Sequence, residues 1–286
     1  MKPESPAPYF FTGEQISGFQ LIRPLRVREL SECWYAFRRA DRLPVAVKFL
    51  HPGHPRIPQF YAMAEFLETA PDAFLIRVFE SGETVSGFPY AVMEYASGGT
   101  LRRRLSECGR LSLAESVHLL RSMLCGLAVL HSRGMVHRDV KPDNIWLTSG
   151  GDFRLGDFGL TRIPGYPEER GKIFGTASFM SPEQACDSTV VDGRSDLYSL
   201  GVVLFEALTG ERFRPKGSFS ETLKYILRDR TAPPVDRLKP LATEKLALLL
   251  GRMLEPLPEL RPASAHDLLL ELDAMSLPGG FSPADS

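Results

Sequence analysis

The sequence predicts an α+β fold in which a strand-rich first third is followed by a mainly helical remainder. Between residues 19 and 95, short apolar runs separated by turn residues indicate strands. After Gly98 and Gly99, apolar residues recur at helical spacing instead. The 286 residues, 43% of them hydrophobic and 24% charged, can form one large core or two lobes that share a cleft.

The strand runs come first, and one helix interrupts them. Strands are expected at residues 19–25, 33–38, 45–50, 74–81 and 90–94. The helix spans about residues 58–70, where Phe60, Met63 and Leu67 recur at helical spacing and Pro58 stands in the first turn. Later helices are expected at 114–133, 195–208, 220–228, 243–253 and 264–275.

Both ends of the chain and its charge narrow the classes of function. Residues 1–18, rich in Pro, Ser and Glu, predict a flexible leader, and residues 279–286 predict a flexible tail. The net charge of -1 provides no broad basic surface for nucleic acid or an anionic membrane. No signal peptide is recognisable, and the apolar stretch at 200–208 is far shorter than the ~20 residues of a membrane helix. Four scattered cysteines without a CxxC pair favour reduced thiols and a cytoplasmic location.

Two motifs carry the polar residues that phosphoryl transfer requires. HRDVKPDN occupies residues 137–144, and DFG follows at 157–159. VAVK lies upstream at 45–48, and SPE lies downstream at 181–183. In this order, the motifs resemble the signature set of the protein kinase family, and the resemblance covers about residues 19–275. It implies the bilobal protein-kinase fold, with a small β-sheet N-lobe plus one helix at 19–95 and a larger, mainly helical C-lobe at 96–278.

The resemblance also implies ATP as co-substrate, together with Mg²⁺ or Mn²⁺. Asp139 would orient the substrate hydroxyl and accept its proton, and Lys48 and Lys141 would contact the phosphates. Asn144 and Asp157 offer the hard oxygen ligands that Mg²⁺ prefers. A lysine at the position of Lys141 marks the Ser/Thr kinases of the family.

Further nucleotide contacts follow from the stretch AVMEY at residues 91–95, which resembles the family's hinge. The resemblance places Met93 as gatekeeper and directs the backbone of Glu94 and Ala96 to the adenine edge. Trp146 either stacks on the base, fills its space, or is simply a large core residue. The other residues expected to bind the nucleotide are Arg28, Cys33 and Ala46.

The loop that should be rich in glycine, residues 25–33, contains none. Arg26, Arg28 and Ser31 occupy the glycine positions, where backbone N–H groups would approach the phosphates. Either the Arg28 guanidinium replaces those donors, or the side chain blocks the site.

The helix at 58–70 departs from the family pattern as well. An ungapped count places Met63 where a glutamate should pair with Lys48. Glu65 would take that place only if the connection were shortened, so the Lys–Glu pair is expected to be absent or rebuilt.

The segment after DFG lacks the usual sites of phosphorylation. Arg138 precedes the catalytic aspartate, and in the family that the motifs resemble an arginine there commonly implies control by a phosphate on this segment. Between Arg162 and Gly175 there is no Ser or Thr, and Tyr166 carries the only hydroxyl. Glu168 and Glu169 supply fixed negative charge for Arg138, so we expect activity that is independent of phosphorylation.

Three structural roles are implied by the same resemblance. Thr176 would shape the substrate-docking loop, Glu183 would pair with Arg261, and Asp196 would hold the backbone of the catalytic loop.

The sequence therefore favours a protein Ser/Thr kinase that acts on a protein substrate. The alternative is a pseudokinase, a signalling scaffold with weak or no nucleotide binding, because the departures gather in the ATP-holding segments. A small-molecule kinase of related fold is disfavoured by the SPE segment and the long helical lobe.

Overall fold

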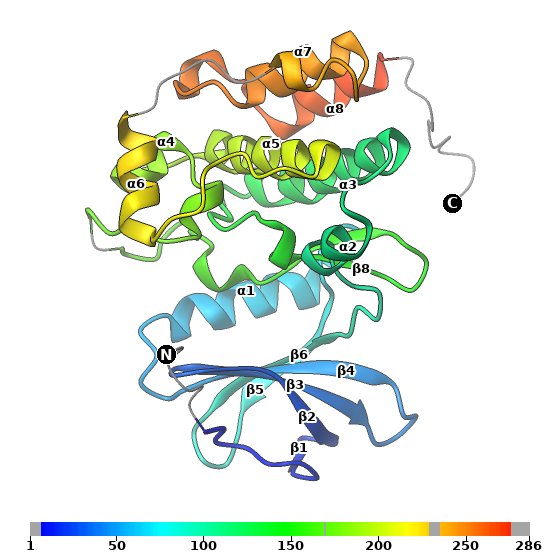
Figure 1. The fold of residues 1–286 in the computed structure, drawn as a ribbon. Coiled ribbons are helices and arrows are strands. Elements are labelled where there is room, and N and C mark those ends of the chain that lie inside the picture. Colours follow the sequence, from blue (N-terminus) through cyan, green and yellow to red (C-terminus); the bar gives the residue numbers. More distant parts are fainter. Residues whose placement is uncertain (1–6, 169, 229–234, 276–286) are drawn as a thin grey trace. The chain divides into compact units, whose positions relative to one another are not determined.

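The computed structural model describes residues 7–168, 170–228 and 235–275, and the chain divides into two compact units, residues 1–97 and 98–286. The predicted tail at 279–286 lies outside the described residues. The first unit is a β-sheet with one helix, and the second is mainly helical (Figure 1). The α+β class and the order of strands before helices are thus confirmed.

Unit 1 is an antiparallel sheet with strand order β1-β2-β3-β4-β6-β5. The strands are β1 Gln15–Ile16, β2 Phe19–Arg28, β3 Ser31–Arg38, β4 Pro44–Leu50, β5 Val78–Glu83 and β6 Pro89–Glu94. The helix α1, Ile57–Thr69, packs against β5. β5 begins at Val78 rather than at 74, because the buried Leu75 and Ile76 belong to the connection that precedes it.

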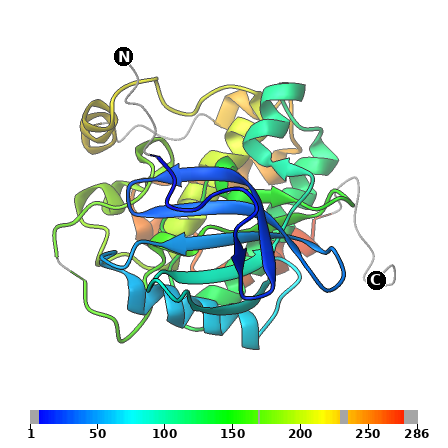
Figure 2. The same cartoon turned by 90° about the horizontal axis from the view of Figure 1, so that it is seen from below.

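The N-terminal segment packs on this sheet, which differs from the predicted flexible leader. The Phe10 ring stacks on Phe49 at 4.1 Å between centroids, and Ile16 joins the same buried cluster. The buried Glu32 carboxylate accepts hydrogen bonds from the Tyr9 backbone N–H at 2.5 Å and from Trp34 Nε1 at 2.7 Å. Figure 2 shows the segment in dark blue. Its aromatic residues outweigh the Pro and Ser composition of the leader, whose residues 1–6 are not described.

Unit 2 combines a small sheet, β7-β8-β9, with seven α-helices in its described residues. The strands are β7 Gly99–Thr100, β8 Ile145–Leu147 and β9 Phe153–Leu155. The helices are α2 Leu101–Cys108, α3 Leu113–His131, α4 Pro182–Cys186, α5 Gly193–Thr209, α6 Phe219–Arg228, α7 Glu244–Met253 and α8 Ala265–Asp273. Most begin at a side-chain cap, as at Ser112, where the reciprocal bonds with Glu115 form a capping box.

The helix α3 is the central element of unit 2. It contacts α5, α8 and β9, and Leu119, Leu120 and Leu127 on it are fully buried. It is also long and apolar enough to meet a length-and-composition test for a membrane span, and it is the one helix of the described residues that does so. Because the buried core helix of a globular domain meets the same test, this finding is only weak evidence of a membrane span.

The packed N-terminal segment leads to a prediction about stability. Replacing Phe10, which is 6% exposed, with Ala should lower the free energy of unfolding by about 3 kcal/mol, because the ring leaves a cavity against Phe49. The neighbouring Phe11→Ala is the matched control, since Phe11 is 67% exposed and should change stability little. Urea unfolding of both variants measures the difference. Equal effects of the two substitutions would support the flexible leader instead.

Candidate active site

The loop that carries Asp139 is fixed by a buried carboxylate on α5. Asp196 Oδ2 accepts the His137 backbone N–H and Oδ1 accepts that of Arg138, each at 2.8 Å, and His131 Nε2 lies 2.9 Å from Oδ2. Burial alone would raise the pKa of Asp196, but these contacts outweigh it and hold the pKa below its usual value. The expected structural role of Asp196 is confirmed.

His137 adds a second restraint on the same loop. Burial lowers the pKa of the His137 ring, against the opposing pull of Asp196. A neutral ring with its proton on Nε2 can donate to the Gly156 carbonyl at 3.2 Å and accept the Asp139 backbone N–H on Nδ1 at 3.3 Å. One tautomer therefore ties the catalytic loop to the residue before the DFG motif.

The Asp139 carboxylate is held by three side chains. Oδ1 accepts the Thr176 hydroxyl at 2.8 Å, and Oδ2 accepts Lys141 Nζ at 2.6 Å and Asn144 Nδ2 at 2.9 Å. Lys141 Nζ also donates to Thr176 Oγ1 at 2.6 Å. The sequence assigned Thr176 only a loop-shaping role, and this direct contact was not anticipated.

The side-chain oxygen of Asn144 is suited to bind a metal ion. Its amide nitrogen donates to Asp139, whereas Oδ1 is buried and has no hydrogen-bond partner among the described residues. Such an orphaned oxygen normally has an unseen partner, and a hard cation suits it. The other proposed ligand, Asp157, has a left-handed backbone with φ 57°, an uncommon conformation that is concentrated at functional sites. The Asn144 oxygen therefore fits a divalent metal ion, and Asp157 offers a carboxylate as the second proposed ligand.

The described residues contain no cluster of three His, Cys, Asp or Glu side chains suited to a metal. A site with one carboxylate and one amide oxygen is consistent with Mg²⁺, which usually keeps several waters and completes its ligands with substrate phosphates.

In unit 1, Lys48 lies in a row of residues that crosses the sheet. Lys48 pairs with Cys33 on β3 and with Ala91 on β6, and Cys33 pairs in turn with Arg26 on β2. Directly paired residues share a face, so these side chains lie on the face opposite Trp34 and Val47 of the core. The register therefore brings Lys48, Cys33 and Arg26 together.

The remaining nucleotide-binding candidates divide between the two units. In unit 1, Ala46 pairs directly with Met93, Glu94 ends β6, and Ala96 is buried just beyond it. In unit 2, Trp146 lies on β8 opposite Thr100 and Arg154 and is partly exposed.

The segment without glycine forms a tight hairpin. Arg28 pairs with Ser31, so only Glu29 and Leu30 connect β2 to β3. Arg28 is exposed at the tip of this hairpin.

The helix α1 places its residues as the ungapped count predicted. Met63 is buried with 4% exposure, whereas Glu65 is exposed. Met63 therefore occupies the inward position on α1.

The Arg138 guanidinium forms a buried bidentate pair with Glu168. NH1 and NH2 donate to the Glu168 carboxylate at 2.5 and 2.6 Å, and NH1 also donates to the Ser188 carbonyl at 2.9 Å. Nε donates to the Leu160 carbonyl at 2.7 Å. The pairing of Arg138 with a fixed negative charge is confirmed for Glu168, and Glu169 lies outside the described residues.

Two further residues, Gln184 and Gly175, lie against the Arg138 backbone carbonyl. The sequence analysis assigned a role to neither. Gln184 Nε2 donates to the carbonyls of Arg138 at 2.6 Å and Phe174 at 2.8 Å. A Cβ on Gly175 would lie 2.7 Å from the Arg138 carbonyl oxygen, and φ 117° there favours glycine. The sequence signal that could have identified them is their place in the stretch GTASFMSPEQ, on either side of the SPE motif.

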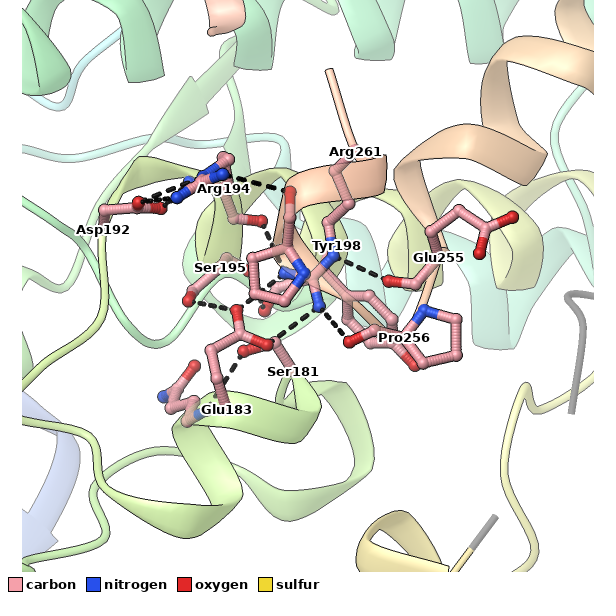
Figure 3. Close-up of polar contacts among 12 residues, drawn as sticks. Ser181, Glu183, Asp192, Arg194, Ser195, Tyr198, Glu255, Pro256 and Arg261 are labelled. Atoms are coloured by element: carbon pink, nitrogen blue, oxygen red, sulfur yellow. Dashed lines mark hydrogen bonds and ion pairs between the residues drawn. The ribbon is translucent and has the colours of Figure 1, made fainter. Parts of the chain in front are cut away.

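The expected pair between Glu183 and Arg261 is confirmed. Arg261 NH1 and NH2 donate to Glu183 at 2.6 and 2.8 Å, and Ser195 Oγ donates to the same carboxylate at 2.6 Å (Figure 3). The Arg261 guanidinium also lies 4.8 Å from the centre of the Tyr198 ring. Burial would raise the pKa of Glu183, but the bonds from Arg261 and Ser195 lower it overall.

Comparison with known proteins agrees with this geometry. The family model for the protein kinase domain matches residues 29–271. The serine/threonine-protein kinase PknL of Mycobacterium tuberculosis is 41% identical over 178 residues, which cover 60% of this chain and 44% of PknL. The serine/threonine-protein kinase PknB of Mycobacterium leprae is 34% identical over 241 residues, 80% of this chain and 38% of PknB.

A third relative matches a longer part of the chain. The probable serine/threonine-protein kinase SCO3848 of Streptomyces coelicolor is 31% identical over 257 residues, 86% of this chain and 38% of its own length. The chain thus spans less than half the length of these relatives.

The Arg138–Glu168 pair predicts activity without phosphorylation. Phosphatase treatment of the active protein should leave phosphate transfer unchanged, because the Glu168 carboxylate supplies the charge that a phosphate would bring. Glu168→Ala should lower the rate by on the order of 10-fold to 100-fold, because the unpaired Arg138 would displace the neighbouring Asp139.

The exposed pair Arg103–Glu107 provides the control. Glu107→Ala should change stability by less than about 1 kcal/mol and leave the rate unchanged, since both side chains are more than half exposed. The prediction fails if mass spectrometry finds an obligatory phosphate on Tyr166 in active protein.

The Glu183–Arg261 pair predicts a dependence of stability on pH. The folded-state pKa of Glu183 is lowered, so its stabilising effect is complete above the unfolded-state pKa and is lost as pH falls through the folded-state value. Glu183→Gln should cost about 3–5 kcal/mol at pH 7, and the difference from wild type should shrink below about pH 4. Urea unfolding over a pH series measures this, and a difference that is constant with pH would contradict it.

Proposed function

Because the chain belongs to the protein kinase family, we propose that it transfers the γ-phosphate of ATP to a Ser or Thr hydroxyl of a protein substrate. The observation that carries the proposal is the Asp139 carboxylate, whose Oδ1 already accepts a threonine hydroxyl at 2.8 Å. A carboxylate so placed can orient a substrate hydroxyl and accept its proton.

The proposed roles of the surrounding residues follow from their contacts. Lys141 neutralises charge beside Asp139 and would contact the transferring phosphoryl group. Asn144, through the Oδ1 that has no hydrogen-bond partner in the described part of the chain, would hold Mg²⁺ together with Asp157, or Mn²⁺ in its place. The bound ion would neutralise charge on the phosphates.

In unit 1, Lys48 would contact the phosphates, with Arg26 and Arg28 as further cations on the same face of the sheet. Ala46, Met93, Glu94 and Ala96 would line the adenine site, as the resemblance of this stretch implies. We further propose a cytoplasmic location, which the four free thiols support.

The scaffold alternative rests on the glycine-free hairpin and the buried Met63, both in unit 1. The similarity to Ser/Thr kinases and the retained Asp139, Lys141 and Asn144 weigh against it, because a scaffold needs none of these polar contacts.

Phosphate transfer and nucleotide binding test the proposal together. Wild type should transfer labelled phosphate from Mg-ATP to a generic protein, and Asp139→Asn should lower the rate by about 100-fold or more. Asp152→Asn is the control, because its exposed carboxylate lies outside the site. A thermal shift with Mg-ATP at 100 times its Kd should reflect about 2.7 kcal/mol of added stability. If the protein shows no phosphate transfer and no thermal shift, the result would support the scaffold alternative.

A further inference from the structure

A buried arginine in the connection between α5 and α6 reaches a segment that lies far from it in the sequence. Arg214 is 6% exposed, and its NH1 donates to the backbone carbonyls of Ala177 at 3.2 Å and Ser178 at 3.0 Å. Its NH2 donates to the Tyr198 hydroxyl at 2.7 Å. One guanidinium thus joins α5 to the short 3-10 helix Ala177–Phe179, the 177–179 turn.

The 177–179 turn depends on outside partners for its carbonyl groups, because a single 3-10 turn leaves most of them unpaired. Arg214 binds the first two carbonyls, and the third accepts the Ser199 hydroxyl at 2.9 Å. Thr176 directly precedes the turn, and its hydroxyl donates to Asp139 Oδ1 at 2.8 Å. The partners of the turn therefore fix where Thr176 lies against Asp139.

The ring of Tyr198 packs against the Arg214 guanidinium, whose centre lies 5.4 Å from the ring centre. Arg261 lies 4.8 Å from the centre of the same ring (Figure 3). Burial raises the pKa of Tyr198, although Arg214 and Arg261 act in the opposite direction, so the hydroxyl stays protonated and accepts from Arg214 through its oxygen. Through Tyr198, Arg214 is thus linked to the Glu183–Arg261 pair.

The chemistry of arginine suits this place better than that of a residue that merely fills it. A buried guanidinium is unfavourable unless its donors are used. The planar fork presents five donors in fixed directions, so it can hold two successive carbonyls and a hydroxyl at once, whereas a lysine is a point charge. An apolar residue at position 214 would take these donors away from the buried carbonyls of the turn.

We infer that Arg214 is a positioning residue for phosphate transfer to a protein substrate: it fixes the 177–179 turn and thereby holds Thr176 against Asp139. Arg214 acts through the turn, so its loss affects the use of the protein substrate. The residues proposed to bind ATP and the metal ion lie on other segments of the chain, so the use of ATP is unaffected. This inference rests on the proposed protein-kinase function.

Steady-state kinetics with a peptide substrate and Mg-ATP tests the inference. Arg214→Ala should lower kcat/KM for the peptide by about tenfold or more, while KM for ATP changes by less than about twofold. Arg214→Lys, which keeps the charge and part of the hydrogen bonding, should lie between Arg214→Ala and wild type. Arg237→Ala is the matched control and should equal wild type, because Arg237 packs over Phe205 of α5 and pairs with the exposed Glu211 instead of the turn.

Chemical rescue separates the loss of the guanidinium from a general loss of structure. Guanidinium ion, added well below its denaturing concentration, should restore part of the peptide kcat/KM of Arg214→Ala, because the truncated side chain leaves a space of its shape beside the two carbonyls. Tetramethylammonium at the same concentration supplies the same charge without hydrogen-bond donors and should restore nothing. An equal response to both ions would contradict the positioning role.

Hydrogen–deuterium exchange provides a readout that needs no phosphate transfer. The Phe179 N–H donates to the Thr176 carbonyl at 2.9 Å, and the Met180 N–H donates to the Ala177 carbonyl at 3.2 Å. Both amides should exchange about tenfold faster in Arg214→Ala than in wild type, while α3 keeps its protection. Faster exchange without transfer by any variant would uphold the anchoring of the turn and remove the kinase activity. Unchanged exchange, or equal losses for peptide and ATP, would overturn the inference.

Discussion

The buried Asp196 carboxylate is the constraint on which the geometry of the candidate site depends. It binds two successive backbone N–H groups, those of His137 and Arg138, and Arg138 has a left-handed backbone with φ 65°. A non-glycine residue in that conformation persists only where its surroundings fix it. Because Asp139 follows directly, the strained turn determines where the Asp139 carboxylate points. The buried charge is stable there because its hydrogen bonds outweigh the unfavourable effect of burial on it.

The same turn links the site to the segment that follows DFG. The Arg138 backbone carbonyl accepts Gln184 Nε2, its backbone N–H donates to Asp196, and its guanidinium pairs with Glu168. One residue thus connects the catalytic loop, α5 and the segment around Glu168. The absence of a side chain on Gly175 leaves room for the Arg138 carbonyl. A fixed carboxylate at Glu168 is therefore bonded to the residue that directly precedes Asp139, which is why we expect its charge to affect phosphate transfer.

The sequence predicted those features that depend on periodicity, motifs or formal charge. The long helices follow from recurring apolar residues, whereas α2 was missed because its eight residues include three arginines and bury only Leu101 and Leu105. The Glu168 pair could be predicted because few charges are available to Arg138. By contrast, the bond from Thr176 to Asp139 and the path of Arg214 to the Ala177 carbonyl depend on side-chain rotamers and long-range packing. The leader was misjudged from composition, although Tyr9, Phe10 and Phe11 already formed an aromatic run.

The glycine-free hairpin is compatible with phosphate binding if side chains, rather than backbone N–H groups, supply the hydrogen-bond donors. A glycine-rich loop presents backbone N–H groups to phosphates. In this hairpin, strand pairing continues to Arg28 and Ser31, so the backbone there is part of the ladder between β2 and β3. Arg26 and Arg28 alternate along β2 and share a face with Cys33 and Lys48. A guanidinium binds phosphate bidentately without requiring an open backbone, so under the proposed function the donors would come from the Arg26 and Arg28 side chains rather than from the main chain.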